Sequence, residues 1–230
     1  MTIETALRKT LLVIPSINGA KLLERMLPTL RIPGELVVVL DQGSADNTED
    51  VCRSAGVGLR QLGRAHTYTE ACNIGAEMAR ERGCDFVFVA NNDITFTTDV
   101  MRELLEELLT DPDLGIVAPA QILIDKTATQ RQLAYRVYWD LETLTFKHDF
   151  VPPPGNTMRL EADFCELTLA GVRMSVIDKI GFLDNEYGFY HEDADFGFRV
   201  REAGYTCAYL TYSQIEHWTS STFSSQPSQL

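Results

Sequence analysis

The segment CDFVFVANND, residues 84–93, is an apolar run that ends in Asn91, Asn92 and Asp93. Polar side chains at the end of a buried strand cost free energy unless they find partners. Mg²⁺ and Mn²⁺ favour oxygen ligands, so Asp93 is a candidate ligand for a divalent cation. The alternative is a carboxylate that serves only in a turn.

A second cluster of ionisable residues consists of His191, Glu192, Asp193 and Asp195, followed by Arg199. On a helix, Asp195 and Arg199 are four residues apart, so an ordinary ion pair accounts for that acid. Glu192 and Asp193 would stand at the helix N-terminus, where the helix dipole favours carboxylates. Capping needs one acid only, and a second carboxylate at this place could accept a proton as a general base. The pair therefore also contains a candidate general base.

Short apolar strands alternate with longer amphipathic segments over the first 120 residues. Apolar residues at helical spacing indicate helices, and continuous apolar runs indicate buried strands. The sequence predicts strands over residues 10–16, 35–41, 56–63, 85–91 and 114–120, and helices over 20–30, 47–55, 68–82 and 98–110. This alternation is typical of a mostly parallel sheet with helices on both faces. We expect a Rossmann-like α/β/α sandwich.

The alternation stops near residue 121 and resumes near residue 162. Residues 121–160 hold three consecutive prolines, several aromatic residues and no clear period, which predicts an insertion of irregular strands and loops. The insertion has five basic and four acidic residues in a chain of net charge -13, a balance that an anionic or ring-bearing ligand would favour. A strand over 162–171, helices near 173–180 and 191–203, and a strand over 205–211 complete the pattern. We expect one domain over residues 1–230, with a polar tail over 218–230.

Polar residues follow the predicted strands, at the edge of the sheet where ligands bind in this fold class. They are Pro15, Ser16 and Asn18 after the first strand, Asp41, Gly43 and Ser44 after the second, and Asn91, Asn92 and Asp93 after the fourth. There is no GxGxxG or GxxxxGK[ST] segment, so neither a dinucleotide fingerprint nor a P-loop would bind a phosphate. A divalent cation on Asp93 could bind and neutralise a phosphate instead.

Composition narrows the class of protein. The net charge of -13 argues against a general nucleic-acid or anionic-membrane surface. The five cysteines are scattered without a CxxC pair, which favours free thiols in a reducing cytoplasm. No stretch approaches the roughly 20 apolar residues of a membrane span. The sequence predicts a cytoplasmic protein without stable membrane insertion.

From about Thr10 to His217 the chain resembles the family 2 glycosyltransferases of the GT-A fold. The matching segments, in order, are VIPSING, VVLDQGSADNT, ACNIGAEMA, FVANNDI, LAGVRMSVIDKIGFLDNEYGFYHEDADFGFRVREAGY and IEHW. Their order and spacing together carry the resemblance. Asn91 and Asn92 depart from it, because many relatives have an acid there, and metal affinity without nucleotide should therefore be weak.

The resemblance implies a nucleotide-diphosphate sugar donor, with a UDP- or dTDP-linked hexose expected. It implies that Asp41 lies near the nucleobase and that Asp93 and His217 contact Mn²⁺ or Mg²⁺ on the diphosphate. An inverting transfer would use an acid of the ED pair as base, Asp193 first and Glu192 second. The implied donor contacts are Pro15, Ser16, Asn18, Asp41, Gly43, Ser44, Asn73, Asn92 and Gly171. Residues 10–120 would bind the donor and residues 121–217, including the insertion, the acceptor.

Two alternatives stay open. A nucleotidyltransferase that makes nucleotide sugars should carry a glycine-rich, basic segment after the first strand, where PSINGAKLLE has only Lys21. A catalytically silent sugar-nucleotide or glycan-binding protein would keep the crevice without turnover. The expected acceptor is a hydroxyl of a glycan, with protein and polynucleotide acceptors left open, and the sequence does not specify the oligomeric state.

Overall fold

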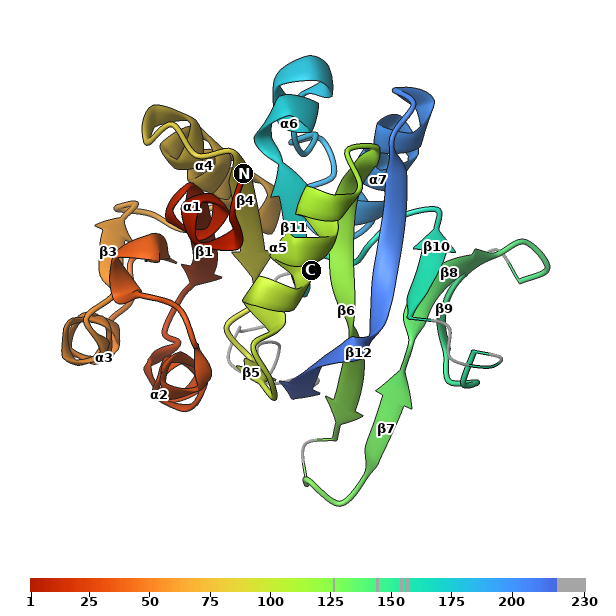
Figure 1. Ribbon diagram of the computed structural model, residues 1–230. Helices are drawn as coiled ribbons and strands as arrows, with labels where there is room; N and C mark the ends of the chain where they lie inside the picture. The colour runs from red at the N-terminus through yellow and green to blue at the C-terminus, as the bar shows by residue number, and fades with distance from the viewer. Residues whose placement is uncertain (126, 144, 154, 156–157, 219–230) are drawn as a thin grey trace.

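The computed structural model describes residues 1–125, 127–143, 145–153, 155 and 158–218, so residues 219–230 of the predicted polar tail lie outside it (Figure 1). The helices are α1 (Ile3–Arg8), α2 (Ala20–Met26), α3 (Thr48–Ala55), α4 (Tyr68–Glu81), α5 (Val100–Thr110), α6 (Met174–Ile180) and α7 (Glu192–Glu202), with 3-10 turns at Leu27–Thr29 and Gly34–Leu36. The strands are β1 (Thr10–Ser16), β2 (Val37–Asp41), β3 (Gly58–Gln61), β4 (Phe86–Ala90), β5 (Ile94–Phe96), β6 (Leu114–Ile124), β7 (Arg131–Ala134), β8 (Arg136–Asp140), β9 (Thr145–Asp149), β10 (Arg159–Ala162), β11 (Leu169–Arg173) and β12 (Thr206–Trp218).

The central sheet has the strand order β10-β12-β6-β11-β4-β1-β2-β3. Strands β1 to β4 pair in parallel, and so do β6 and β12, whereas β11 is antiparallel to both of its neighbours, β4 and β6. The predicted mostly parallel sheet in an α/β/α sandwich is therefore confirmed. The carboxyl ends of β1, β2 and β4 lie at one edge of the sheet, together with the loops that follow them.

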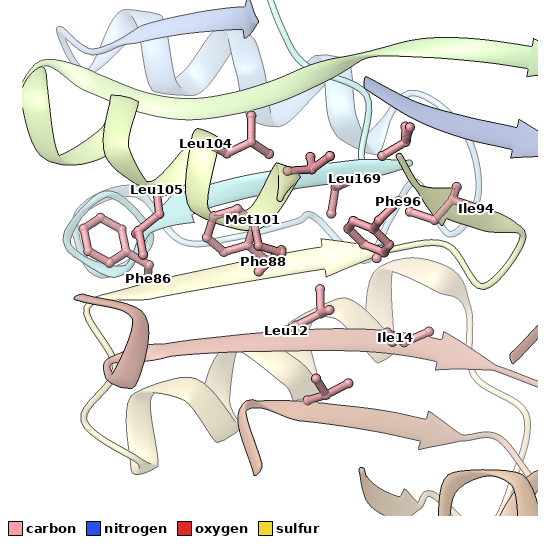
Figure 2. Close-up of a cluster of buried hydrophobic side chains, with 14 of the residues drawn as sticks. Leu12, Ile14, Phe86, Phe88, Ile94, Phe96, Met101, Leu104, Leu105 and Leu169 are labelled. Carbon is pink, nitrogen blue, oxygen red and sulfur yellow. The ribbon is translucent and has the colours of Figure 1, made fainter. Parts of the chain in front are cut away.

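Helices cover both faces of this sheet because successive strand residues point to opposite sides. In β1, Leu12 and Ile14 belong to the core under α1, α2, α3 and α5, while Leu11 and Val13 belong to the core under α4, α6 and α7. Figure 2 shows the first of these cores, with α5 lying over the sheet. Its labelled side chains are Leu12, Ile14, Phe86, Phe88, Ile94, Phe96, Met101, Leu104, Leu105 and Leu169.

Helix ends follow the expected chemistry where the sequence marks them. Thr67 and Glu70 form a capping box at the start of α4, since each side chain accepts a hydrogen bond from the other's backbone N–H. Gly83, which follows this helix, has φ of 67°, the left-handed conformation that glycine adopts without strain. These signals are local, so the sequence alone could predict them.

The larger differences lie beyond residue 90. Strand β5 was not predicted, and β12 runs to Trp218 instead of ending near residue 211. The insertion forms β7, which pairs with β6, β10, which pairs with β12, and the separate two-stranded sheet of β8 and β9. The strand expected from residue 162 begins only at Leu169, so residues 163–168 form a loop before it.

Gly171 lies inside β11, opposite Phe88 of β4 and Val117 of β6. A Cβ atom at this position would lie 2.5 Å from two carbons of the Phe88 ring. Gly171 therefore lies within the sheet, and its contact with the donor stays a prediction. The Phe88 ring accounts for the glycine.

Within the described residues, no helix combines the length and the apolar character that crossing a membrane requires.

Gly171→Ala should lower the free energy of unfolding by about 1–3 kcal/mol, because the added methyl group overpacks a filled core. Urea denaturation measures the loss. The same substitution in a Phe88→Leu background should cost clearly less, since the ring that meets the methyl group is gone. An equal loss in both backgrounds would show that the ring is not the cause.

Candidate active site

The antiparallel pairing of β5 with the end of β12 brings two predicted metal ligands together (Figure 1). Ile94 pairs with His217, and the Trp218 backbone N–H donates to the Asp93 carbonyl at 3.0 Å. His217 Nε2 lies 3.6 Å from Asp93 Oδ1, with 18% of the histidine side chain and 7% of the aspartate side chain exposed. Asp93 and His217 therefore face each other in a nearly buried place.

The other ring nitrogen of His217, Nδ1, lies 3.0 Å from Oε1 of Gln121 in β6. Burial lowers the pKa of His217, and the charge of Asp93 acts in the opposite direction. A lowered pKa favours the neutral imidazole at neutral pH, and a neutral imidazole carries a lone pair on one nitrogen.

Asp93 and His217 fit one side of a divalent cation site. A carboxylate oxygen suits Mg²⁺ and Mn²⁺, and an imidazole nitrogen suits first-row transition metals. The part of the chain that the structure describes holds no group of three His, Cys, Asp or Glu side chains gathered for a metal. A cation bound here would need water or substrate to supply its remaining ligands.

A guanidinium lies near the same acid. Arg25 of α2 stacks on Trp218, with its Cζ 4.2 Å from the ring centroid. Burial lowers the pKa of Arg25, and the charges of Asp93 and Glu216 oppose this effect. The surroundings of Asp93 thus include a fixed positive charge that was not expected from the sequence.

Asn92 links the end of β4 to the end of β1. Its Nδ2 donates to Ser16 Oγ at 2.9 Å, and both residues are buried. A Cβ atom at Gly19 would lie 2.2 Å from Ser16 Oγ and 2.6 Å from Asn92 Nδ2, so only glycine fits beside this contact. Pro15 precedes Ser16 within β1, also buried.

Asp41 lies at the end of β2 and is 6% exposed. Its Oδ1 accepts hydrogen bonds from the hydroxyl and the backbone N–H of Ser44. Ser44 Oγ in turn accepts from the Asn18 backbone N–H at 2.8 Å, and Asn18 Oδ1 accepts from the Ala45 backbone N–H at 2.8 Å. Gly43 has φ of 86°, which the turn requires. These contacts hold the loops after β1 and β2 against each other.

Glu192 and Asp193 begin α7, as expected, and both carboxyl groups lie where ionisation is disfavoured. Burial raises the pKa of Glu192 to about 7 and also raises the pKa of Asp193. Asp193 Oδ1 accepts from the Ala194 backbone N–H at 2.8 Å. Raised carboxyl pKa values in a polar site are typical of general acids and bases.

The remaining acid of this cluster has the structural role expected for it. Asp195 Oδ2 accepts from Arg199 Nε at 2.8 Å, and Arg199 also donates to the carbonyls of Ile180 and Phe182. The chain reaches α7 through Tyr190 and His191, which both have φ of 70°. Two consecutive non-glycine residues in this conformation store strain, a feature that is common at functional sites.

Glu166, in the loop before β11, is a site residue that the sequence reading missed. Burial and the charge of Asp193 raise the pKa of Glu166 to about 7, and its hydrogen bond from Gln121 acts in the opposite direction. Its Oε2 accepts from Gln121 Nε2 at 2.7 Å. Its sequence signal is an acid inside the apolar run FCELTL. The strand predicted over this run made Glu166 look like an ordinary exposed strand residue.

Asn73 is the predicted donor contact whose amide is engaged elsewhere. Its Nδ2 donates to the Leu183 carbonyl and to Asn185 Oδ1, and its Oδ1 accepts from the Leu183 backbone N–H. Asn73 of α4 therefore anchors the loop after α6. Together with Gly171 inside the sheet, it stands apart from the residues gathered at the strand ends.

Comparison with known proteins identifies the family of the chain. Residues 11–181 match the profile of Glycosyl transferase family 2. Two curated proteins of Mycobacterium tuberculosis, from strains CDC 1551 / Oshkosh and ATCC 25618 / H37Rv, are each named N-acetylglucosaminyl-diphospho-decaprenol L-rhamnosyltransferase. Each is 26% identical over 223 residues, which covers 85% of this chain and 71% of the relative.

Two solved structures share the fold at low sequence identity. GalNAc-T7 with UDP, GalNAc and Mn²⁺ has a TM-score of 0.75 and 14% identity, covering 91% of this chain and 43% of that chain. The mannosyltransferase PcManGT from Pyrobaculum calidifontis, in complex with GDP-Man and Mn²⁺, has a TM-score of 0.66 and 13% identity, covering 93% of this chain and 58% of that chain. This chain thus spans about half the length of these two proteins, and the likeness establishes the fold alone.

The family profile covers most of the chain, and the chain shares its fold with the two solved glycosyltransferases. The chain belongs to glycosyl transferase family 2 and is a glycosyltransferase with the GT-A fold.

Proposed function

We propose that the enzyme transfers a hexose from a nucleotide-diphosphate sugar to an acceptor hydroxyl, with inversion and with Mn²⁺ or Mg²⁺. The observation that carries the proposal is the approach of Asp93 Oδ1 and His217 Nε2 to 3.6 Å beside the carboxyl ends of the parallel strands. The presence of Mn²⁺ with UDP or GDP-Man in the two solved structures supports a metal. The nitrogen ligand favours Mn²⁺ over Mg²⁺, which prefers oxygen.

The donor would lie across the loops that follow β1, β2 and β4. Asp41 would accept a nucleobase N–H, because Ser44 holds its carboxyl group in place through Oδ1. The proposed lining is Pro15, Ser16, Asn18, Gly43, Ser44 and Asn92. The diphosphate would then reach Asp93 and His217, and Arg25 would add positive charge near them.

Asp193 is the proposed base. It would take the proton of the acceptor hydroxyl while that oxygen attacks the anomeric carbon opposite the leaving diphosphate. The raised pKa of Asp193 makes its carboxylate a stronger base. A bound divalent cation would neutralise the charge that develops on the leaving diphosphate. Asp93 and His217 would hold that cation, and Glu192 would line the same pocket.

The M. tuberculosis relatives are named as L-rhamnosyltransferases that act on N-acetylglucosaminyl-diphospho-decaprenol. A deoxyhexose therefore belongs among the donors to test, and a glycan hydroxyl is the acceptor we propose. Family membership argues against a nucleotidyltransferase, the first alternative. A silent binding protein would be recognised by an absence of turnover with every donor.

Asp93→Asn should abolish the Mn²⁺-dependent part of UDP or dTDP binding, because the substitution removes the carboxylate charge. We expect kcat/KM to fall roughly 100-fold or more, which is about 3 kcal/mol of transition-state stabilisation. Calorimetry with UDP and dTDP, with and without Mn²⁺, measures the binding. Asp50→Asn, on the exposed face of α3, is the matched control. An unchanged Mn²⁺ effect in the Asp93 variant would contradict its proposed role.

Asp193→Asn should keep nucleotide affinity within a few fold and remove transfer, since the amide cannot accept the acceptor proton. Asp195→Asn, two residues away, should instead lower stability through the lost Arg199 ion pair and leave turnover in the folded enzyme. Single-turnover transfer and denaturation curves on both variants separate the two roles. Near-normal turnover of Asp193→Asn would refute the assignment.

Glu192→Gln should stabilise the protein at high pH. The folded state raises the pKa of Glu192 from 4.5 to about 7, so this group's contribution to stability is present below pH 4.5 and is lost as pH rises through 7. The neutral amide escapes that loss, worth up to about 3 kcal/mol at pH 8. Urea denaturation near pH 4.5 and pH 8 measures the difference, with exposed Glu202→Gln as control. Retained turnover would leave Asp193 as the base, and lost turnover would make Glu192 the base.

A further inference from the structure

Gln121 connects His217 to a second carboxylate. Its Nε2 donates to Glu166 Oε2 at 2.7 Å, and its Oε1 lies 3.0 Å from His217 Nδ1. Gln121 is 4% exposed, so water cannot easily replace either partner. The three side chains come from β6, the loop before β11 and the end of β12, and their contacts run without a break.

The orientation of the Gln121 amide follows from the chemistry of its neighbours. An ionised carboxylate has acceptors only, so the NH₂ group of Gln121 must face Glu166. The amide oxygen then faces His217, and only a protonated Nδ1 can donate to it.

Asp93 competes for the histidine proton from the other side. A proton on Nε2 would point to Asp93 Oδ1, but that distance is 3.6 Å, beyond hydrogen-bonding range, whereas Nδ1 is 3.0 Å from Gln121. The shorter contact decides the competition in favour of the proton on Nδ1. Nε2 then presents its lone pair to Asp93.

We propose that Gln121 and Glu166 are positioning residues that hold His217 in the Nδ1–H tautomer with the lone pair of Nε2 directed at Asp93. Hydrogen bonds of this kind fix which nitrogen of a histidine binds a metal. The use of that lone pair for a cation rests on the proposed function, whereas the tautomer itself does not. With the proton on Nδ1, two acceptors, His217 Nε2 and Asp93 Oδ1, face each other at 3.6 Å, an arrangement that suits a cation.

Glu166 is itself surrounded by titratable groups, which sets the conditions of a test. Asp193 of α7 acts on it by charge, and Nε2 of His148 in β9 lies 3.8 Å from its Oε2. The pKa of Glu166 is about 7, so measurements belong at about pH 8, where the carboxylate form is the larger fraction.

The test is a long-range ¹H–¹⁵N correlation spectrum of the protein with ¹⁵N-labelled histidine, without metal or nucleotide, at about pH 8. The chain has four histidines, and His217→Gln identifies the signals of His217 by their loss. The wild-type protein should show a protonated Nδ1 and an unprotonated Nε2 for His217. A protonated Nε2 would overturn the proposal.

Three variants show whether the hydrogen bonds or only the packing matter. Gln121→Met keeps the volume and removes the acceptor, so the proton of His217 should move to Nε2, toward Asp93. The exchange Gln121→Glu with Glu166→Gln restores an acceptor at Nδ1, held by the new amide, and should return the proton to Nδ1. Glu161→Gln, an exposed acid of β10, should change nothing. A Gln121→Met protein that keeps the Nδ1–H tautomer would also overturn the proposal.

A second readout connects the tautomer to the proposed metal site. Loss of an outer hydrogen bond to a metal-binding histidine commonly costs 10- to 100-fold in affinity, so Gln121→Met should weaken Mn²⁺-dependent UDP or dTDP binding by roughly that factor. If the wild-type enzyme shows no Mn²⁺-dependent binding, the proposed function fails while the spectrum still decides the tautomer. If binding is present and the variant loses none of it, the positioning role fails on its own.

Discussion

The antiparallel contact between β5 and the end of β12 is the constraint on which the site depends. β12 pairs with β6 along its length, with a register shift between Leu210 and Gln214, and its last residues also pair with β5. A three-residue strand has little stability of its own, so β5 exists because β12 reaches it. The pairing with β5 places His217 beside Asp93, and the pairing with β6 brings Gln121 within 3.0 Å of His217 Nδ1. If the pairing of the last residues of β12 shifted by one residue, the His217 side chain would point to the opposite face of the sheet.

Several acids of the candidate site are buried, which would favour a bound cation. Asp93, Glu166, Glu192 and Asp193 all lie in a poorly solvated region, and three of them have raised pKa values. Like charges that are close together in low dielectric destabilise the ionised forms. Arg25 offsets part of this negative charge near Asp93. His217 adds little positive charge at neutral pH, because burial lowers its pKa. A site of this kind stores electrostatic free energy that a bound cation would release.

Periodicity predicted best those elements that are defined by their own residues. The apolar runs of β1, β2 and β4 alternate between two cores, and Gly83 and Asp195 act where local rules put them. Features that depend on distant partners were harder to predict. β5 has only three residues, Gly171 is dictated by Phe88 of another strand, and Asn73 is engaged by a loop far along the chain. Glu166 was hidden because an acid in an apolar run looks like an exposed strand position. No local pattern could reveal that Glu166 accepts a hydrogen bond from Gln121 and is affected by the charge of Asp193.

The amide at position 92 shows how this chain limits the charge beside Asp93. Asn92 donates to Ser16 Oγ, and this contact, with Gly19 packed against it, fixes the loop that carries Asp93. An aspartate at position 92 would place a second buried negative charge next to Asp93. Arg25, a positive charge in the described surroundings, already interacts with Asp93. A neutral amide avoids that cost, because burying an unpaired charge is far more expensive than burying a hydrogen-bonded amide. The consequence is a site with one carboxylate and one neutral imidazole, whose attraction for a divalent cation is modest until a diphosphate adds its own negative charge. Cation and donor would then bind as one unit, so that the metal arrives where the leaving group needs it.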